Sequence, residues 1–309
     1  MANNTFKYTQ FKLEKLNKVE EILYELEEYK PLTLRQIYYQ MVGKGFIPNN
    51  KSQYNMLSEL LKWARIDCRI SWNDIEDRSR FYNSPETDRS LDSFVKAWYD
   101  SYLSGFKLDY LASQQNYIEL WYEKDAITSV IRKIASKYRL PTVAATGYNS
   151  ITFQHDFTER INNKPDKQPV ILFASDFDPS GLDMFESIQK TINDEMGFNH
   201  RGIIFRRVAL SRKQIDEFHL PKSIDAIKPK DSRAPKFIKE YGNIAVEIDA
   251  LKPSDLQRII EDAVLEYIDP LLLEQKMNEE KLVLLNIQEF LKDFYVFKVS
   301  RKWNLKVGG

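Results

Sequence analysis

Residues 170–181, VILFASDFDPSG, carry the pattern that decides the fold class of this chain. The apolar run from Val170 to Ala174 has the length of one buried strand, and acidic residues follow it at once. Helical sequence follows the loop, and a strand that leads into a helix is the repeating unit of a parallel sheet. The stretch therefore predicts an α/β domain with Asp176 and Asp178 at the carboxyl end of a strand.

Further strands are predicted on both sides of this stretch, separated by helical sequence of the length that a parallel βαβ sheet requires. They cover Tyr117–Tyr122, Thr142–Ala145 and Ile203–Val208, with residues 244–248 as another possible strand. Two helices, over about 254–268 and 270–294, are expected after the sheet. We therefore expect a Rossmann-like parallel sheet with C-terminal helices over residues 115–309.

The N-terminal part is predicted to be helical. Residues 12–28 have apolar positions at helical spacing, Thr33 and Gln36 form a capping box for a second helix, and a third helix follows residues 48–50 and runs to about Arg65. A short extended piece with Trp72 and Arg80 comes next. Three helices and a wing predict a winged helix over residues 1–82, and a helix near 90–105 predicts a helical linker over 83–114.

Composition excludes several classes of protein. Of the 309 residues, 43% are hydrophobic, enough to fill the cores of two domains. Lys+Arg and Asp+Glu balance at 45 each, so any attraction to phosphate must be local. The single cysteine, Cys68, excludes a disulfide framework, and no secretion signal or bilayer-spanning apolar run is evident. We expect a soluble cytoplasmic protein that is not bound to a membrane, and the overall charge says nothing about its partners.

Carboxylates follow two of the predicted strands. Glu123 ends the first, and Asp176 and Asp178 follow the third. In an open parallel sheet ligands bind outside these ends, and gathered carboxylates repel one another unless a cation neutralises them. Oxygen ligands favour Mg²⁺, with Mn²⁺ as an alternative. The competing interpretation is that such aspartates only cap helices.

The second helix contains a candidate nucleophile. At about 100° per residue Tyr38 falls inside the apolar stripe and is interpreted as structural, whereas Tyr39 falls outside it. Arg35 lies one turn before Tyr39 on the same face, where a guanidinium can hold a phosphate beside the phenol. This arrangement suits transesterification, with Tyr39 attacking phosphorus.

The Arg-x-x-Tyr-Tyr element of residues 35–39, followed by a strand-end glutamate and Asp-x-Asp-Pro-x-Gly, resembles the A subunit of topoisomerase VI and the meiotic double-strand-break transesterase. The resemblance covers roughly residues 30–250 and implies a winged helix followed by a Toprim domain. It implies Tyr39 as nucleophile, Glu123 as metal ligand or general acid/base, Asp176 and Asp178 as metal ligands, and Gly147 in an active-site loop. Lys124 and Asp125 receive no firm role.

The resemblance also implies limits on activity. Topoisomerase VI needs an ATP-binding B subunit, and this chain has no Gly-x-x-x-x-Gly-Lys phosphate loop. The short chain is most similar to stand-alone relatives called Mini-A, so an unlinked B-like ATPase stays possible. A homodimer is expected because two active sites are needed to cut both strands, and each site may be shared between subunits.

Other charged residues have two interpretations. One face of the third helix is predicted to contact double-stranded DNA, with a solvated face as the alternative, and it carries Lys51, Asn55, Ser58, Lys62 and Arg65. Possible wing contacts are Arg69, Arg78 and Arg80. Zinc is not expected, because Cys68 has no cysteine partner and the histidines are dispersed. For 231–234 and 247–249 we favour helix capping over support of a metal site.

Three functions remain open from the sequence. The first is DNA cleavage by transesterification through Tyr39. The second is a hydrolytic Toprim nuclease in which Tyr39 only packs or binds DNA. The third is a DNA-binding protein without turnover.

Overall fold

The structure is a computed structural model, and it describes residues 6–76, 97, 101, 105–145, 151–222, 227 and 231–294. The chain forms two compact units. The first joins Met1–Phe81 with Asn116–Tyr267, and the second joins Tyr82–Gln115 with Ile268–Gly309. None of the helices in the described ranges combines the length and apolarity that crossing a lipid bilayer requires.

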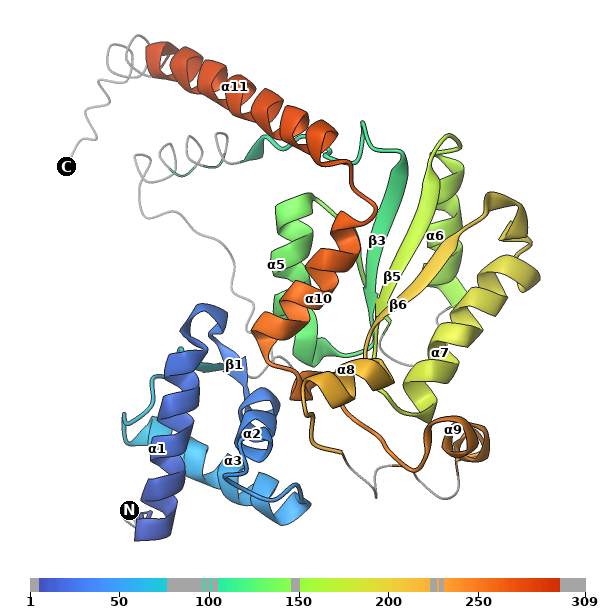
Figure 1. The fold of residues 1–309 in the computed structure, drawn as a ribbon. Helices are drawn as coiled ribbons and strands as arrows, with labels where there is room; N and C mark the ends of the chain where they lie inside the picture. Colours follow the sequence, from blue (N-terminus) through green and yellow to red (C-terminus); the bar gives the residue numbers. More distant parts are fainter. Residues whose placement is uncertain are drawn as a thin grey trace, which may run out of the picture. The chain divides into compact units, whose positions relative to one another are not determined.

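A four-stranded parallel sheet organises the first unit, in the order β4-β3-β5-β6 (Figure 1). The strands are β3 (Asn116–Tyr122), β4 (Thr142–Ala144), β5 (Gln168–Ala174) and β6 (Ile204–Ala209). All four predicted strands are confirmed, with bounds that shift by one or two residues. Because β3 connects outward to β4 and β5 connects outward to β6, the strand order reverses between β3 and β5. Their carboxyl ends therefore flank the position where such sheets bind ligands.

Helices cover both faces of this sheet. In Figure 1, α5 (Thr128–Tyr138) and α10 (Pro253–Leu265) lie on one face, and α6 (Ile151–Asn162) and α7 (Pro179–Lys190) on the other. Burial on both faces explains why β3 and β5 are apolar throughout instead of alternating. The exception is Glu119, which is fully buried but accepts hydrogen bonds from Tyr117, Trp121 and Arg160.

Shorter elements complete this part of the chain. Their bounds are η2 Asp125–Ile127, the π-helical η3 Thr191–Glu195, η4 Phe198–Arg201, α8 Arg212–Glu217, α9 Ala234–Tyr241 and η5 Ile248–Ala250. The possible strand over 244–248 is reduced to an isolated antiparallel bridge between Phe177 and Val246. This bridge places the turn at 247–249 next to the acidic loop after β5.

Three helices form the N-terminal part, as predicted: α1 (Gln10–Glu25), α2 (Leu34–Gly43) and α3 (Lys51–Ile66). A 3₁₀ turn, η1 (Glu27–Tyr29), follows α1. The capping box of Thr33 and Gln36 is present at the start of α2, and Asn50 caps α3. Their apolar residues meet in one core, to which α3 contributes the buried side chains of Leu57, Leu60, Leu61 and Ala64.

The described strands beside these helices are shorter than a wing requires. The strands β1 (Leu32–Thr33) and β2 (Ile75–Glu76) contain two residues each and pair in parallel. A wing formed by antiparallel strands is therefore not seen among residues 6–76. Arg78, Arg80 and most of the expected helix at 90–105 lie outside the described residues.

In the second unit, α11 (Pro270–Phe294) packs beside the segment before β3. The Glu280 carboxylate accepts hydrogen bonds from the Leu108 amide and the Tyr110 hydroxyl. Gln114 exchanges two hydrogen bonds with the backbone of Asp269. The second C-terminal helix is thus present over the predicted range, and these hydrogen bonds attach it and the residue before it to the segment 108–114.

Candidate active site

Three carboxylates gather where β3 and β5 end. Glu123 follows β3, and its Oε2 accepts a hydrogen bond of 3.3 Å from the Asp176 amide. Asp178 begins α7, where its Oδ1 accepts from the Gly181 amide at 2.7 Å. Asp178 therefore caps a helix, as the competing interpretation expected, and it also lies at the edge of the sheet.

Electrostatic repulsion marks this group of acids. Burial, together with the neighbouring Asp176 and Asp178, raises the pKa of Glu123 to about 7. Burial also raises the pKa of Asp178, and Asp176 adds to that effect. A site that raises the pKa of a glutamate into the neutral range favours any cation that relieves the repulsion.

A half-buried arginine lies beside the same acids. The Arg207 side chain, from β6, donates hydrogen bonds to Ser175 Oγ at 3.1 Å and to the Asp176 carbonyl oxygen at 2.7 Å. Burial lowers the pKa of Arg207 to about 10, although Asp178 and Glu123 act in the opposite direction. The guanidinium thus supplies positive charge near the acids, and these two hydrogen bonds do not occupy the carboxylate oxygens of Glu123 or Asp178.

Gly181 keeps the site open. A Cβ atom at this position would lie 2.5 Å from the Asp176 carbonyl oxygen and 3.1 Å from Glu123 Oε2. The first distance is far below normal contact, and the obstructing atom belongs to the backbone. The glycine is therefore required for the close approach of α7 to the strand ends.

A second group of charges adjoins the first and centres on Lys124. Its Nζ lies 3.1 Å from Asp176 Oδ2, 2.7 Å from Glu247 Oε2 and 3.2 Å from Asp249 Oδ1. The three acids keep the pKa of Lys124 above its usual value, although burial alone would lower it. The Ile248 amide also donates to Asp176 Oδ1 at 2.7 Å. The turn at 247–249 is thereby fixed to the loop after β5.

Arg35 and Tyr39 of α2 contact this second group. The Arg35 guanidinium pairs with Glu247, and its Nε lies 3.2 Å from Asp249 Oδ2. The Arg35 Cζ is 6.0 Å from the centre of the Tyr39 ring, as expected for residues one helical turn apart. Tyr39 lies near Glu247 and Asp249, and burial and these two acids raise the pKa of Tyr39.

Tyr38 and Tyr39 differ in environment as the helical period predicted. Tyr38 is buried, and its hydroxyl donates to Asn49 Oδ1 at 3.0 Å. Tyr39 is only partly buried and contacts the charged group. It is nevertheless less exposed than expected for a free residue on a helix surface, because Glu247 and Asp249 lie against it.

Glu247, Asp249 and Arg207 were not predicted as site residues. The preference for capping at 247–249 was wrong, since both carboxylates turn toward Lys124 and Arg35. The Glu-x-Asp spacing after a possible strand repeats the Asp-x-Asp pattern after β5, and that signal was available in the sequence. At 231–234 Asp231 pairs with the Arg233 side chain and accepts from the Arg233 amide just before α9, and α9 has no side-chain cap.

The predicted DNA-contacting face of α3 lies off the buried stripe. Lys51, Asn55 and Lys62 are exposed, whereas Ser58 and Arg65 are half-buried. Arg65 stacks over the exposed ring of Trp72 at 5.0 Å, and Arg69 over Tyr8 at 4.6 Å. The face is available to a ligand. Gly147 lies outside the described residues.

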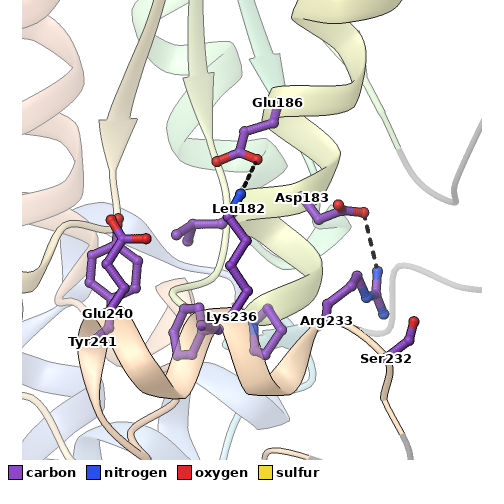
Figure 2. A pocket seen from close by; sticks show the side chains of 10 residues that line it. Leu182, Asp183, Glu186, Ser232, Arg233, Lys236, Glu240 and Tyr241 are labelled. Carbon is purple, nitrogen blue, oxygen red and sulfur yellow. Dashed lines mark hydrogen bonds and ion pairs between the residues drawn. The ribbon is translucent and has the colours of Figure 1, made fainter.

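A cavity of about 250 Å³ lies between α7 and α9 (Figure 2). It begins beside Pro179 but is lined by neither Glu123 nor Asp176. Figure 2 shows its charged walls paired internally, with Lys236 on Glu186 at 3.0 Å and Arg233 facing Asp183 at 3.8 Å. Glu240 also lines the cavity, so its three acidic and two basic side chains leave a single surplus negative charge.

The donor set at the strand ends fits a hard divalent cation. Among the described residues of the two groups, five carboxylates (Glu123, Asp176, Asp178, Glu247 and Asp249) are opposed by three cations (Lys124, Arg35 and Arg207). Full ionisation thus leaves two negative charges without compensation. In the described part of the chain no three acidic, histidine or cysteine side chains already enclose a metal position. Glu123, Asp176 and Asp178 lie near one another at the strand ends, but they do not form such an enclosed position.

Comparison with models of known protein families finds no match to this chain, and comparison with curated proteins finds none either.

Proposed function

We propose that the chain cleaves double-stranded DNA by tyrosine transesterification, as a Toprim domain joined to a winged-helix variant of the topoisomerase VI A type. The observation that carries the proposal is the contact between α2 and the carboxyl edge of the sheet. It brings Arg35 and Tyr39 to Glu247 and Asp249, which share Lys124 with Asp176. A phenol, two cationic side chains and carboxylates that could bind a metal ion thus lie at one edge of the sheet.

The proposed reaction conserves the number of phosphodiester-type bonds. The Tyr39 phenol oxygen forms a bond to phosphorus while the bond from phosphorus to a 3′ oxygen breaks. The phenol gives up its proton, and the 3′ oxygen takes one. Nothing is oxidised or reduced, and the covalent protein–DNA link can be reversed by the same chemistry.

The residues of the site have distinct parts in this proposal. Arg35, of which 42% of the side chain is exposed, binds the phosphate beside Tyr39. Mg²⁺ or Mn²⁺, held by Glu123, Asp176 and Asp178, would supply positive charge where negative charge develops on the phosphodiester and the leaving oxygen. The polar face of α3, with Lys51, Lys62 and Arg65, binds the duplex mainly through phosphates.

We also propose a homodimer, because one site cuts one strand. Coupling to ATP would need a separate B-like subunit.

The test is a search for covalent protein–DNA complexes. Purified protein is incubated with supercoiled DNA and Mg²⁺ or Mn²⁺, denatured, and separated on a gel that retains labelled DNA on protein. We expect adducts with the wild type and none with Tyr39→Phe, whereas Tyr38→Phe serves as the matched control and keeps them.

Other outcomes assign the other functions. Cutting that survives in Tyr39→Phe without adducts indicates hydrolysis at the metal site. Binding without nicking or adducts, unchanged by Asp176→Ala, indicates a DNA-binding protein without turnover.

A further inference from the structure

Four charges alternate around a closed circuit at the contact between α2 and the sheet. Arg35 pairs with Glu247, Glu247 with Lys124, Lys124 with Asp249, and Asp249 with Arg35. We call these four residues the charge ring. Each acid contacts both cations, so each cation is held from two directions.

The ring differs from an ordinary surface ion pair in its burial. The Asp249 side chain is 0% exposed and that of Lys124 19%, whereas the side chains of Glu247 and Arg35 are 30% and 42% exposed. The bidentate pair of Arg206 and Glu266 has no such buried member, since its side chains are 36% and 56% exposed. Exposed pairs fix geometry weakly, whereas loss of one member of a buried group leaves its partner uncompensated.

The ring is anchored to the sheet independently of α2. The Phe177 and Val246 backbones exchange two hydrogen bonds, of 2.8 and 3.0 Å, and the Ile248 amide donates to Asp176. Glu247 and Asp249 lie on this fixed segment. Any helix that they hold therefore keeps a defined position relative to Asp176.

Tyr39 depends on the ring through two contacts. Its ring lies beside Arg35, one turn earlier in α2, with the Arg35 Cζ 6.0 Å from the ring centre, and the phenol lies near the Glu247 carboxylate, which raises its pKa. The Tyr38 ring packs against the other side at a centroid distance of 5.3 Å. Rotation of α2 or of the Tyr39 side chain would break at least one of these contacts.

We infer that Glu247 and Asp249 are positioning residues of the proposed cleavage site, which set the place of Arg35 and Tyr39 at the edge of the sheet. This inference rests on the proposed function for its catalytic consequence but not for its structural one. Misplacement of a reacting group by about 1 Å costs roughly a hundredfold in rate.

The experiment compares Glu247→Gln with the wild type, using two measurements. Glu247→Gln keeps the size of the side chain and removes its charge. We expect the rate of adduct formation at saturating DNA to fall by about tenfold to a hundredfold, with the half-saturating DNA concentration unchanged. Glu247→Asp restores the charge with a shorter reach and should recover part of the rate. Glu266→Gln is the matched control, because it removes the carboxylate that pairs with Arg206 outside the ring, and it should leave the rate of adduct formation unchanged.

The second measurement needs no cleavage. In protein with ¹³C-labelled tyrosine, the Tyr39 ring resonance is identified by its absence in Tyr39→Phe. It should move in Glu247→Gln, whereas the Tyr117 resonance should not. An unmoved Tyr39 resonance, or an adduct rate that is equal or higher in Glu247→Gln, overturns the inference. If the wild type forms no adducts but the resonance moves, the proposed function fails and the positioning contact stands.

Discussion

Replacement of Glu123 by Gln should stabilise the protein at alkaline pH while abolishing cleavage. The pKa of Glu123 is raised from 4.5 to about 7 by burial and by Asp176 and Asp178. A carboxyl group whose pKa is raised by folding stabilises the folded state fully below its unfolded pKa. That contribution is lost as the pH rises through the folded pKa.

The size of the effect follows from this shift. Each pKa unit corresponds to about 1.4 kcal/mol, so between pH 5 and pH 8.5 the wild type should lose about 2 to 3 kcal/mol through Glu123. Gln carries no charge at either pH. The stability of Glu123→Gln relative to the wild type should therefore be about 2 to 3 kcal/mol greater at pH 8.5 than at pH 5.

The assay is urea unfolding followed by far-ultraviolet circular dichroism, with EDTA present, at both pH values. Glu217→Gln, which removes an exposed carboxylate of α8, is the control and should show no such difference between the two pH values. Added Mg²⁺ should stabilise the wild type more at pH 8.5 than at pH 5 and should have little effect on Glu123→Gln. A stability difference between Glu123→Gln and wild type that is the same at both pH values would refute the reasoning.

Three further predictions concern residues with different kinds of contact. Gly181→Ala forces a Cβ against the Asp176 carbonyl oxygen, and it should lower the free energy of unfolding by about 1 to 3 kcal/mol and abolish adducts, as urea midpoints and denaturing gels can measure. Tyr38→Phe removes the hydrogen bond to Asn49, and should cost about 1 kcal/mol in the same unfolding assay; a loss of adducts in this variant would contradict its structural role. Lys124→Met leaves the buried Asp249 without one of its cations, so the melting temperature should fall. The decrease should be larger at pH 8 than at pH 5. A decrease of equal size at both pH values would argue against the charge ring.

Local signals in the sequence were sufficient for most helices and strands. Thr33 and Gln36 are three residues apart and cap α2 as expected, and the apolar run at 170–174 forms the core of β5. The grouping of Glu123 with Asp176 was also predictable, because the carboxyl ends of neighbouring parallel strands lie at one edge. In these cases the deciding interactions lie within a few residues or follow from strand direction.

The remaining part of the site depends on tertiary pairing that no local pattern encodes. Arg35 meets Glu247 across more than two hundred residues of sequence, and the bridge between Phe177 and Val246, with the Ile248 amide bond to Asp176, brings that turn to the sheet edge. Capping was the simpler interpretation of Glu247 and Asp249 because it needed no distant partner. The direction of the short strands was unpredictable for a related reason, since Trp72 and its neighbours carry no signal for strand direction and β2 pairs in parallel with β1.

Asp178 combines two duties in one short side chain. Its carboxylate starts α7 by accepting from the Gly181 amide, and it faces Glu123 across the strand ends. Asparagine would keep the cap but not the negative charge, and glutamate would keep the charge but place it one methylene too far to cap well. Of the acidic and amide residues, aspartate alone meets both requirements. Substitutions at this position should therefore be more restricted than helix capping or negative charge would require separately.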